Sequence, residues 1–140
     1  MITKTLNKRT QDDWGSGEFG ASRGTRSHIG IDYCCDPGDK INAPIGGVIT
    51  KLGYPYADAL QFRYVEITDT NEFRHRLFYI KPTVKVGQEV RAGECVGISQ
   101  DISGKYSDPN RNPMLNHMHY EILTQQGDPI NPEIFWNEVI

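Results

Sequence analysis

Short apolar runs, several alternating with polar residues, fill most of the chain and are separated by turns rich in Gly and Pro. The runs "GGVITKLGY", "RYVEITD", "RLFYI" and "HMHYEIL" are rich in β-branched and aromatic residues, which favour strands. A helical signal occurs only at the C-terminus, where Asn131 is placed to cap a turn that begins at Pro132. The pattern predicts an all-β fold, a single compact antiparallel sheet or sandwich domain.

Length, charge and cysteine usage exclude several classes of protein. The 140 residues suit one domain, and a net charge of −3 with no basic cluster beyond "KTLNKRT" argues against nucleic-acid binding. No apolar run is long enough for a transmembrane segment, and the N-terminus lacks the apolar core of a signal peptide. Cys34, Cys35 and Cys95 show no disulfide or thiolate-zinc spacing, so we expect small buried residues.

The strand "HMHYEI" carries two histidines on one face. Side chains alternate along a strand, so His117, His119 and Glu121 point to one side and the intervening residues to the other. The two imidazoles therefore stand side by side, and both can reach one small object. The fourteen-residue connection within "DISGKYSDPNRNPML" leads into this strand and is expected to form one wall of a cleft beside it.

A second candidate cluster lies upstream in "RSHIGIDYCC". His28 and Asp32 would share a strand face but stand too far apart for one ion, so the chain must bend, and Gly30 permits a bend. Together with one histidine of the pair they supply two nitrogens and one oxygen, the ligand set of a catalytic zinc site. The other histidine is then placed to transfer a proton. The alternative from spacing alone is that these histidines are ordinary core or edge residues.

At these residues the chain resembles a known family. "HIGIDYCCDPGDKINAPIGGVI", "VKVGQEVRAGECVG" and "HMHYEI" are similar, in this order, to the lysostaphin-type zinc metallopeptidases, the glycyl-glycine endopeptidases of the duplicated hybrid motif fold. The resemblance implies a β-domain with a central groove over residues 14–140, preceded by an N-terminal extension, residues 1–13. It implies one zinc ion per chain, held by His28, Asp32 and His119, with His117 as the catalytic residue.

The implied activity is hydrolysis of peptide cross-links in bacterial peptidoglycan by a metal-activated water, with peptidoglycan peptides as the partner. A single domain of this kind, with no signal peptide or wall-binding repeat, is typical of phage lysis or virion-associated enzymes, or of proteins released by lysis. The sequence leaves open which peptide bond is cut and what the oligomeric state is.

One departure from the family weakens the inference of catalysis. In "LFYIKP", Ile80 stands where the family has a histidine that helps stabilise the oxyanion, so reduced activity is expected. Tyr79 could lend its hydroxyl only if a bulge reoriented it, and the odd offset of His75 from Ile80 places that histidine on the opposite face.

Two alternative functions remain at this stage. "FYIKP" resembles the vertebrate chemotaxin branch of the same fold, which suggests a catalytically degenerate, zinc-binding interaction module. "HIGID" and "APIGGVI" also resemble the phosphocarrier of a sugar phosphotransferase system, although that family lacks the C-terminal pair of histidines.

Overall fold

The computed structural model describes residues 2–3, 8–9, 19–20, 22–23, 26–27, 29–104 and 114–138. Its strands are β1 (Ser22–Arg23), β2 (Arg26–Ser27), β3 (Ile31–Cys34), β4 (Lys40–Asn42), β5 (Gly47–Gly53), β6 (Tyr64–Thr68), β7 (Arg74–Phe78), β8 (Ile80–Pro82), β9 (Glu89–Val90), β10 (Cys95–Ser99), β11 (His117–Leu123) and β12 (Pro129–Ile130), and its helix is α1 (Pro132–Glu138). The prediction of an all-β fold is confirmed.

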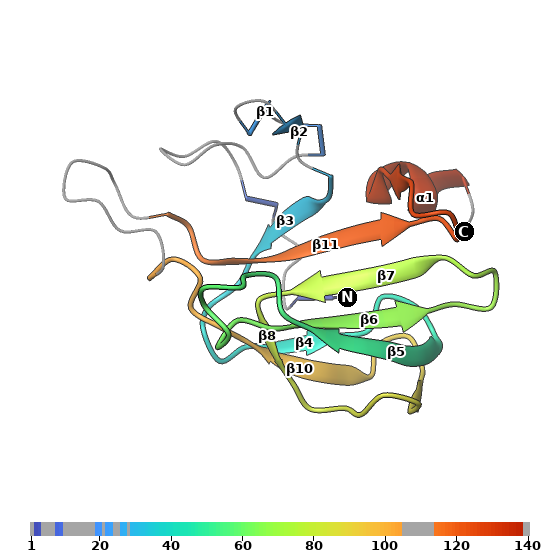
Figure 1. The fold of residues 1–140 in the computed structure, drawn as a ribbon, viewed down its shortest axis with the longest axis horizontal. Helices are drawn as coiled ribbons and strands as arrows, with labels where there is room; N and C mark the ends of the chain where they lie inside the picture. The colour runs from blue at the N-terminus through green and yellow to red at the C-terminus, as the bar shows by residue number, and fades with distance from the viewer. Residues whose placement is uncertain are drawn as a thin grey trace.

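Two sheets form the body of the domain, and every paired strand in them is antiparallel. The larger sheet has the order β12-β11-β7-β6-β5-β9, with β3 also paired to β11, and the smaller has the order β4-β10-β8. Figure 1 shows the long strands β11, β7, β6 and β5 side by side. Strand β11 therefore has β3 and β7 as neighbours, which places its side chains within reach of both.

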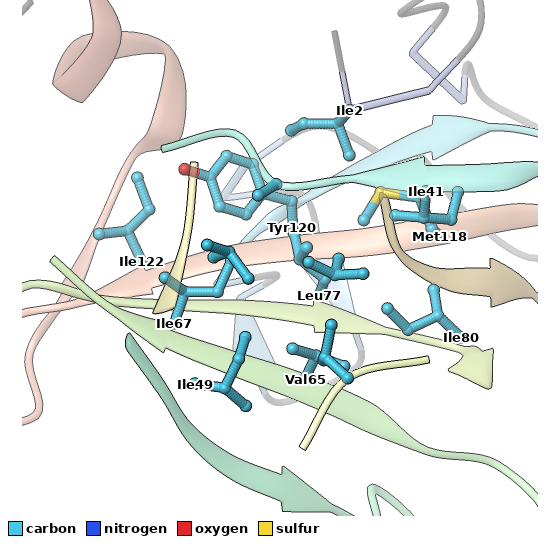
Figure 2. Packing of buried hydrophobic residues seen from close by; sticks show 14 of the residues in the cluster. Ile2, Ile41, Ile49, Val65, Ile67, Leu77, Ile80, Met118, Tyr120 and Ile122 are labelled. Atoms are coloured by element: carbon cyan, nitrogen blue, oxygen red, sulfur yellow. The ribbon is translucent and has the colours of Figure 1, made fainter. Parts of the chain in front are cut away.

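The hydrophobic core accounts for the apolar residues at every second position of β11. Met118, Tyr120 and Ile122 are fully buried and belong to one apolar cluster, which Figure 2 shows between the strands. The cluster also contains Ile2, Ile41, Ala43, Ile49, Val65, Ile67, Leu77, Ile80, Val84, Val90, Val96 and Phe135. Since side chains alternate, the two histidines of β11 lie on the face opposite this core.

The C-terminal helix forms as the sequence predicts. The side chain of Asn131 accepts a hydrogen bond from the Glu133 amide at 3.0 Å, and Pro132 is the first helical residue. Phe135 is 2% exposed and packs edge-on against Phe73. The seven-residue helix is the one helix within the described ranges, and none there could cross a bilayer.

The described parts of the first thirteen residues pack on the domain. Ile2 joins the hydrophobic core, and its carbonyl accepts a hydrogen bond from the Asn42 amide at 2.9 Å. Lys8 forms an isolated antiparallel bridge with Tyr33, and the Arg9 amide donates to the Asp32 carbonyl at 2.8 Å. Lys8 and Arg9 therefore lie along the edge of β3.

The three cysteines are free, and each is half-buried, where the sequence predicted buried residues. Burial raises the pKa of the Cys35 thiol to about 11, so this group stays protonated near neutral pH. A thiol held in this form is a poor nucleophile and a poor metal ligand, in agreement with the absence of a thiolate-zinc pattern from the sequence.

A buried polar network crosses the core side of the large sheet. His75 bonds Asp69 through Nε2 at 2.9 Å and the Tyr120 hydroxyl through Nδ1 at 2.7 Å. Trp136 of α1 donates to the same hydroxyl at 3.3 Å. His75 thus lies on the core side of the sheet, opposite His119, and ties the β6–β7 turn to the helix. Ile80 lies on this core side as well, so the prediction that the two residues occupy opposite faces is wrong, because the positive φ at Tyr79 shifts the alternation.

This network makes the free energy of unfolding of the protein depend on pH. Burial lowers the pKa of His75 below its ordinary value of 6.5, against the opposing effect of Asp69. The unfolded chain binds this proton more readily, so the His75 contribution to stability is complete above about pH 6.5 and decreases as the pH falls below it. We expect His75→Gln to be less stable by about 1–3 kcal/mol at pH 7.5. We also expect it to lose less stability than the wild type between pH 7.5 and 5.5.

Thermal unfolding of both proteins across this pH range measures the difference. Parallel curves for the wild type and His75→Gln would contradict the assignment of the titration to His75.

Candidate metal and catalytic site

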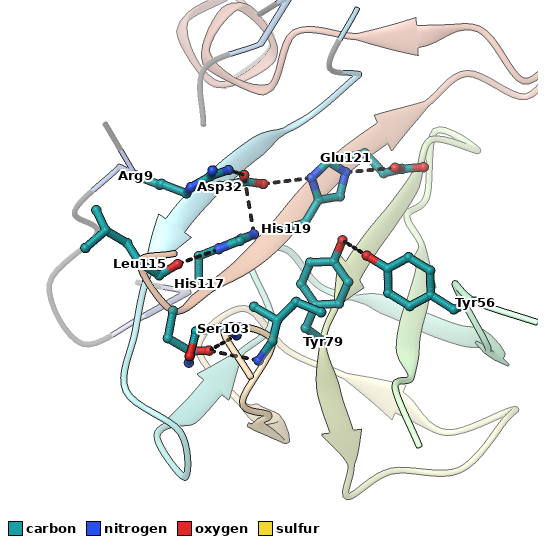
Figure 3. Close-up of polar contacts among 11 residues, drawn as sticks. Arg9, Asp32, Tyr56, Tyr79, Ser103, Leu115, His117, His119 and Glu121 are labelled. Carbon is teal, nitrogen blue, oxygen red and sulfur yellow. Dashed lines mark hydrogen bonds and ion pairs between the residues drawn. The ribbon is translucent and has the colours of Figure 1, made fainter. Parts of the chain in front are cut away.

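Strands β3 and β11 bring three of the four predicted site residues together. Asp32 stands directly opposite His119 in the antiparallel register, and cross-strand partners on one face lie close to each other. The His119 Nδ1 lies 3.0 Å from Asp32 Oδ1, and the His117 Nε2 lies 3.4 Å from Asp32 Oδ2. Figure 3 shows both rings directed at this carboxylate.

The donor atoms of Asp32 and His119 fit a zinc ion. Zinc binds carboxylate oxygen and imidazole nitrogen at about 2.0–2.2 Å, so two ligand atoms of a tetrahedral site lie roughly 3.3 Å apart. Asp32 Oδ1 and His119 Nδ1 have nearly this separation. His28, the third predicted ligand, lies outside the described residues. Among the described residues, no group of three His, Cys, Asp or Glu side chains is placed to hold a metal ion.

Glu121 holds the other side of the His119 ring. Its Oε1 lies 2.9 Å from His119 Nε2, and its Oε2 lies 3.8 Å from Arg76 Nη1. A carboxylate that accepts from one imidazole nitrogen fixes the tautomer and leaves the other nitrogen for a metal. Sequence alternation placed Glu121 on the histidine face but assigned it no role. The signal that could have identified Glu121 is the pattern H-x-H-x-E, which places a carboxylate next to the second histidine on the same strand face.

The two histidines have opposite electrostatic environments. Burial alone lowers the pKa of His119, but hydrogen bonds and charges from Asp32 and Glu121 outweigh it and raise the pKa to about 9 without a metal ion. Burial is the largest influence on His117 and lowers its pKa. The Leu115 carbonyl lies 2.8 Å from His117 Nδ1, so Nδ1 carries the proton and donates. The Nε2 of a neutral His117 ring is then a proton acceptor beside Asp32.

Arg9 is a buried partner of Asp32 that the sequence did not reveal. Its Nη1 donates to Asp32 Oδ2 at 2.9 Å, and both side chains are almost fully buried. The guanidinium balances the carboxylate charge and orients it, with Oδ1 directed at His119. "KTLNKRT" was read as a basic opening, and no local pattern connects it with a residue that lies far along the chain.

The structure corrects the placement of Ile80. Its side chain is fully buried in the hydrophobic core, so Ile80 does not stand at the site. Tyr79, with a positive φ of 68°, takes the place beside the histidines instead. The Tyr79 ring lies 5.6 Å from the ring of His117 and 6.5 Å from the ring of His119, centroid to centroid. The backbone change that would bring Tyr79 to the site is therefore present.

Gly30 is needed for space beside His119. A Cβ at this position would lie 2.4 Å from the Tyr120 carbonyl oxygen and 2.6 Å from His119 Cε1. The glycine lets the chain before β3 approach the His119 ring, a requirement separate from the bend inferred from the sequence.

We expect Gly30→Ala to destabilise the protein by about 1–3 kcal/mol, because the added methyl group overpacks the site. The same methyl group displaces the His119 ring, so zinc affinity is expected to fall as well. Chemical denaturation and a competitive zinc titration measure the two effects. Gly104→Ala is the matched control, because a Cβ there meets Asp101 atoms only at ordinary contact distance. Unchanged zinc affinity in Gly30→Ala would contradict the close approach.

Asn116, the residue just before β11, serves as a structural residue. Its Oδ1 accepts from the Ile102 amide at 2.9 Å, and its Nδ2 donates to the Cys35 carbonyl at 3.0 Å. These bonds fix the chain just before β11. Residues 105–113, most of the loop expected to wall a cleft, lie outside the described residues.

A family model identifies the class of protein. The sequence model of Peptidase family M23 matches residues 26–132, and the chain belongs to this family. The expected resemblance to lysostaphin-type peptidases is thereby confirmed.

Individual proteins are similar to the chain at sequence identities of 29% or less. The chain is 29% identical to leukocyte cell-derived chemotaxin-2 from Mus musculus over 120 residues, which cover 85% of this chain and 76% of the relative. It is similar in structure to lysostaphin, with a TM-score of 0.69 at 19% identity over 96% of this chain and 55% of that one. A mutant catalytic domain of the prophage-encoded M23 protein EnpA from Enterococcus faecalis is similar in structure, with a TM-score of 0.64 at 22% identity. The match covers 85% of this chain and 88% of that one. The chain thus spans about half of the lysostaphin chain.

Proposed function

We propose that this protein is a zinc-dependent endopeptidase that hydrolyses peptide cross-links of bacterial peptidoglycan. The observation that carries the proposal is the 3.0 Å approach of Asp32 Oδ1 to His119 Nδ1, with the His117 Nε2 acceptor beside the same carboxylate. Membership of a peptidase family supports the reaction class. The proposed zinc ligands are His28, Asp32 and His119, one ion per chain.

Each described residue has a distinct part in this proposal. Zinc, when bound, supplies a Lewis acid that activates water for attack on an amide near neutral pH. His117 accepts a proton at Nε2 and later returns it to the leaving amine, while its Nδ1–H stays on the Leu115 carbonyl. Glu121 holds the His119 ring, and Arg9 holds the Asp32 carboxylate.

The substrate class is proposed from the relatives. Lysostaphin is described as an antimicrobial peptidase, and EnpA as a prophage-encoded M23 protein. Their structural likeness supports the M23 fold, and we infer that cross-linked wall peptides are the substrate. A phage lysis or virion-associated role is consistent with this substrate and belongs to the same proposal.

A second candidate function is a zinc-binding interaction module without peptidase activity. The similarity to chemotaxin-2 from two mammals, 29% and 28% identical, favours it. The third alternative, a phosphocarrier, is not carried forward, because the family shown is a peptidase family.

Wall digestion separates the two remaining candidates. Purified walls with glycine bridges and walls with direct D-Ala to diaminopimelate links are incubated with the zinc-loaded protein, and new amino termini are counted and identified. The peptidase proposal predicts new termini from at least one wall, and their loss on chelation. The interaction module predicts none from any wall while zinc remains bound.

A further inference from the structure

We propose that the Tyr79 hydroxyl donates a hydrogen bond to the carbonyl oxygen of the scissile amide as that oxygen gains negative charge. Tyr56 is the positioning residue that holds this hydroxyl. The inference rests on the proposed peptidase function and names a further catalytic residue for it.

The backbone at Tyr79 is bent in a way that serves this side chain. Phe78 stands opposite His119 on the histidine face, so in a regular strand Tyr79 would point to the core and Ile80 to the histidine face. The φ of +68° exchanges these directions, so Ile80 enters the core and Tyr79 lies beside the histidines. A non-glycine residue in this region costs on the order of 1–3 kcal/mol, and such strain persists where the surrounding structure enforces it.

Hydrogen bonds hold the strained backbone in place. The Tyr79 amide donates to the Arg63 carbonyl at 2.8 Å, and the Tyr79 carbonyl accepts from the Gln100 amide at 2.9 Å. The side chain of Gln100 accepts in turn from the Arg63 amide at 3.1 Å. Two neighbouring segments therefore fix the position from which the ring projects.

Aromatic packing fixes the ring itself. Tyr56 stacks nearly parallel to it, at 6.1 Å and 6°, and Phe62 meets it edge-on at 6.4 Å. On its other side the ring meets His117 at 5.6 Å and 86°. The hydroxyl is thus carried on a rigid aromatic cluster that reaches the proton-transferring histidine.

The two tyrosine hydroxyls form a directed pair. They lie 3.0 Å apart, and Figure 3 shows the two hydroxyls directed at each other. A phenol both donates and accepts, so when Tyr56 donates to the Tyr79 oxygen, the Tyr79 O–H can donate to a substrate oxygen that reaches it. A chain of two hydroxyls also polarises the terminal donor.

Amide hydrolysis needs such a donor. Addition of water places negative charge on the former carbonyl oxygen, and one preorganised donor there is typically worth about 10²–10³-fold in rate. Among the described neighbours of His117 and His119, Tyr79 combines a phenol donor, a ring contact to both histidines and a fixed position.

The test compares Tyr79→Phe, Tyr56→Phe and Tyr54→Phe with the wild type. Tyr54 is half exposed and stacks on Arg63, so its variant is the control for loss of a phenol. Two readouts are used on the zinc-loaded proteins: turnover on wall peptides, and the affinity for a glycylglycine phosphinate, a tetrahedral anion that mimics the charged oxygen. Zinc content is measured for every variant.

Tyr79→Phe is expected to lower kcat by about 10²–10³-fold with KM and zinc content unchanged, and to weaken phosphinate binding by a similar factor. Tyr56→Phe should give a smaller loss of the same kind, and Tyr54→Phe none. Equal kcat and phosphinate affinity in the wild type and Tyr79→Phe would overturn the inference and leave the peptidase proposal standing. A zinc-loaded wild type that neither cleaves walls nor binds the phosphinate would overturn the peptidase proposal, and the inference with it.

Discussion

Replacing Asp32 with Ala is expected to lower zinc affinity by more than about 100-fold, since loss of an outer-shell partner alone typically costs 10–100-fold. Asp32 would supply the negatively charged ligand, and its Oδ1 lies 3.0 Å from the other described donor atom, His119 Nδ1. Removal of the carboxylate leaves two neutral imidazoles as the remaining proposed ligands. Metal analysis of the dialysed protein and a competitive zinc titration measure this loss.

Two matched variants make this prediction specific. Glu121→Gln keeps all three proposed ligands but weakens the hold on the His119 ring, so we expect an intermediate loss of about 10–100-fold. Asp58→Ala removes an exposed carboxylate and should leave zinc affinity unchanged. Full zinc occupancy in dialysed Asp32→Ala would show that the ligand assignment is wrong.

The second large effect is expected at His117. His117→Ala should lower turnover on wall peptides by about 10²–10⁴-fold, the usual contribution of general acid–base catalysis, and should leave zinc bound. The structure supports a proton-transfer role because the Nδ1–H is held by the Leu115 carbonyl and Nε2 faces the site. Replacement of His119 should instead remove both zinc and activity.

Steady-state rates and zinc content, measured on the same preparations, distinguish the two histidines. Undiminished turnover in His117→Ala would exclude its role in proton transfer. Loss of zinc from His117→Ala would exchange the roles assigned to His117 and His119.

Local sequence rules predicted the parts of this fold that depend on local structure. Alternation in β11 separated the histidine face from the core face, and the Asn131–Pro132 signal gave the start of the helix. The contact between Asp32 and His119 joins residues 87 positions apart, and strand pairing at that separation is not encoded in spacing. The family resemblance, carried by several ordered motifs, supplied that pairing before the structure showed the two residues together.

The sequence failed where backbone geometry or distant contacts override local rules. The family resemblance put Ile80 at the site, but a positive φ at Tyr79 shifts the strand alternation by one residue and turns Ile80 into the core. Left-handed backbone is uncommon for tyrosine, so no residue type marks the exception. Arg9 was missed for a different reason: its partner Asp32 lies 23 positions away, and burial of the pair depends on the edge of β3.

Zinc titration of the cleavage reaction tests the central claim most directly. The metal-free protein is mixed with increasing zinc and purified peptidoglycan, and new amino termini are counted at each ratio. The account predicts that cleavage rises with added zinc and reaches its plateau at one zinc ion per chain, with the same end point in a metal-binding titration. Zinc bound at one equivalent with no new amino termini at any ratio, from any wall tested, would contradict it.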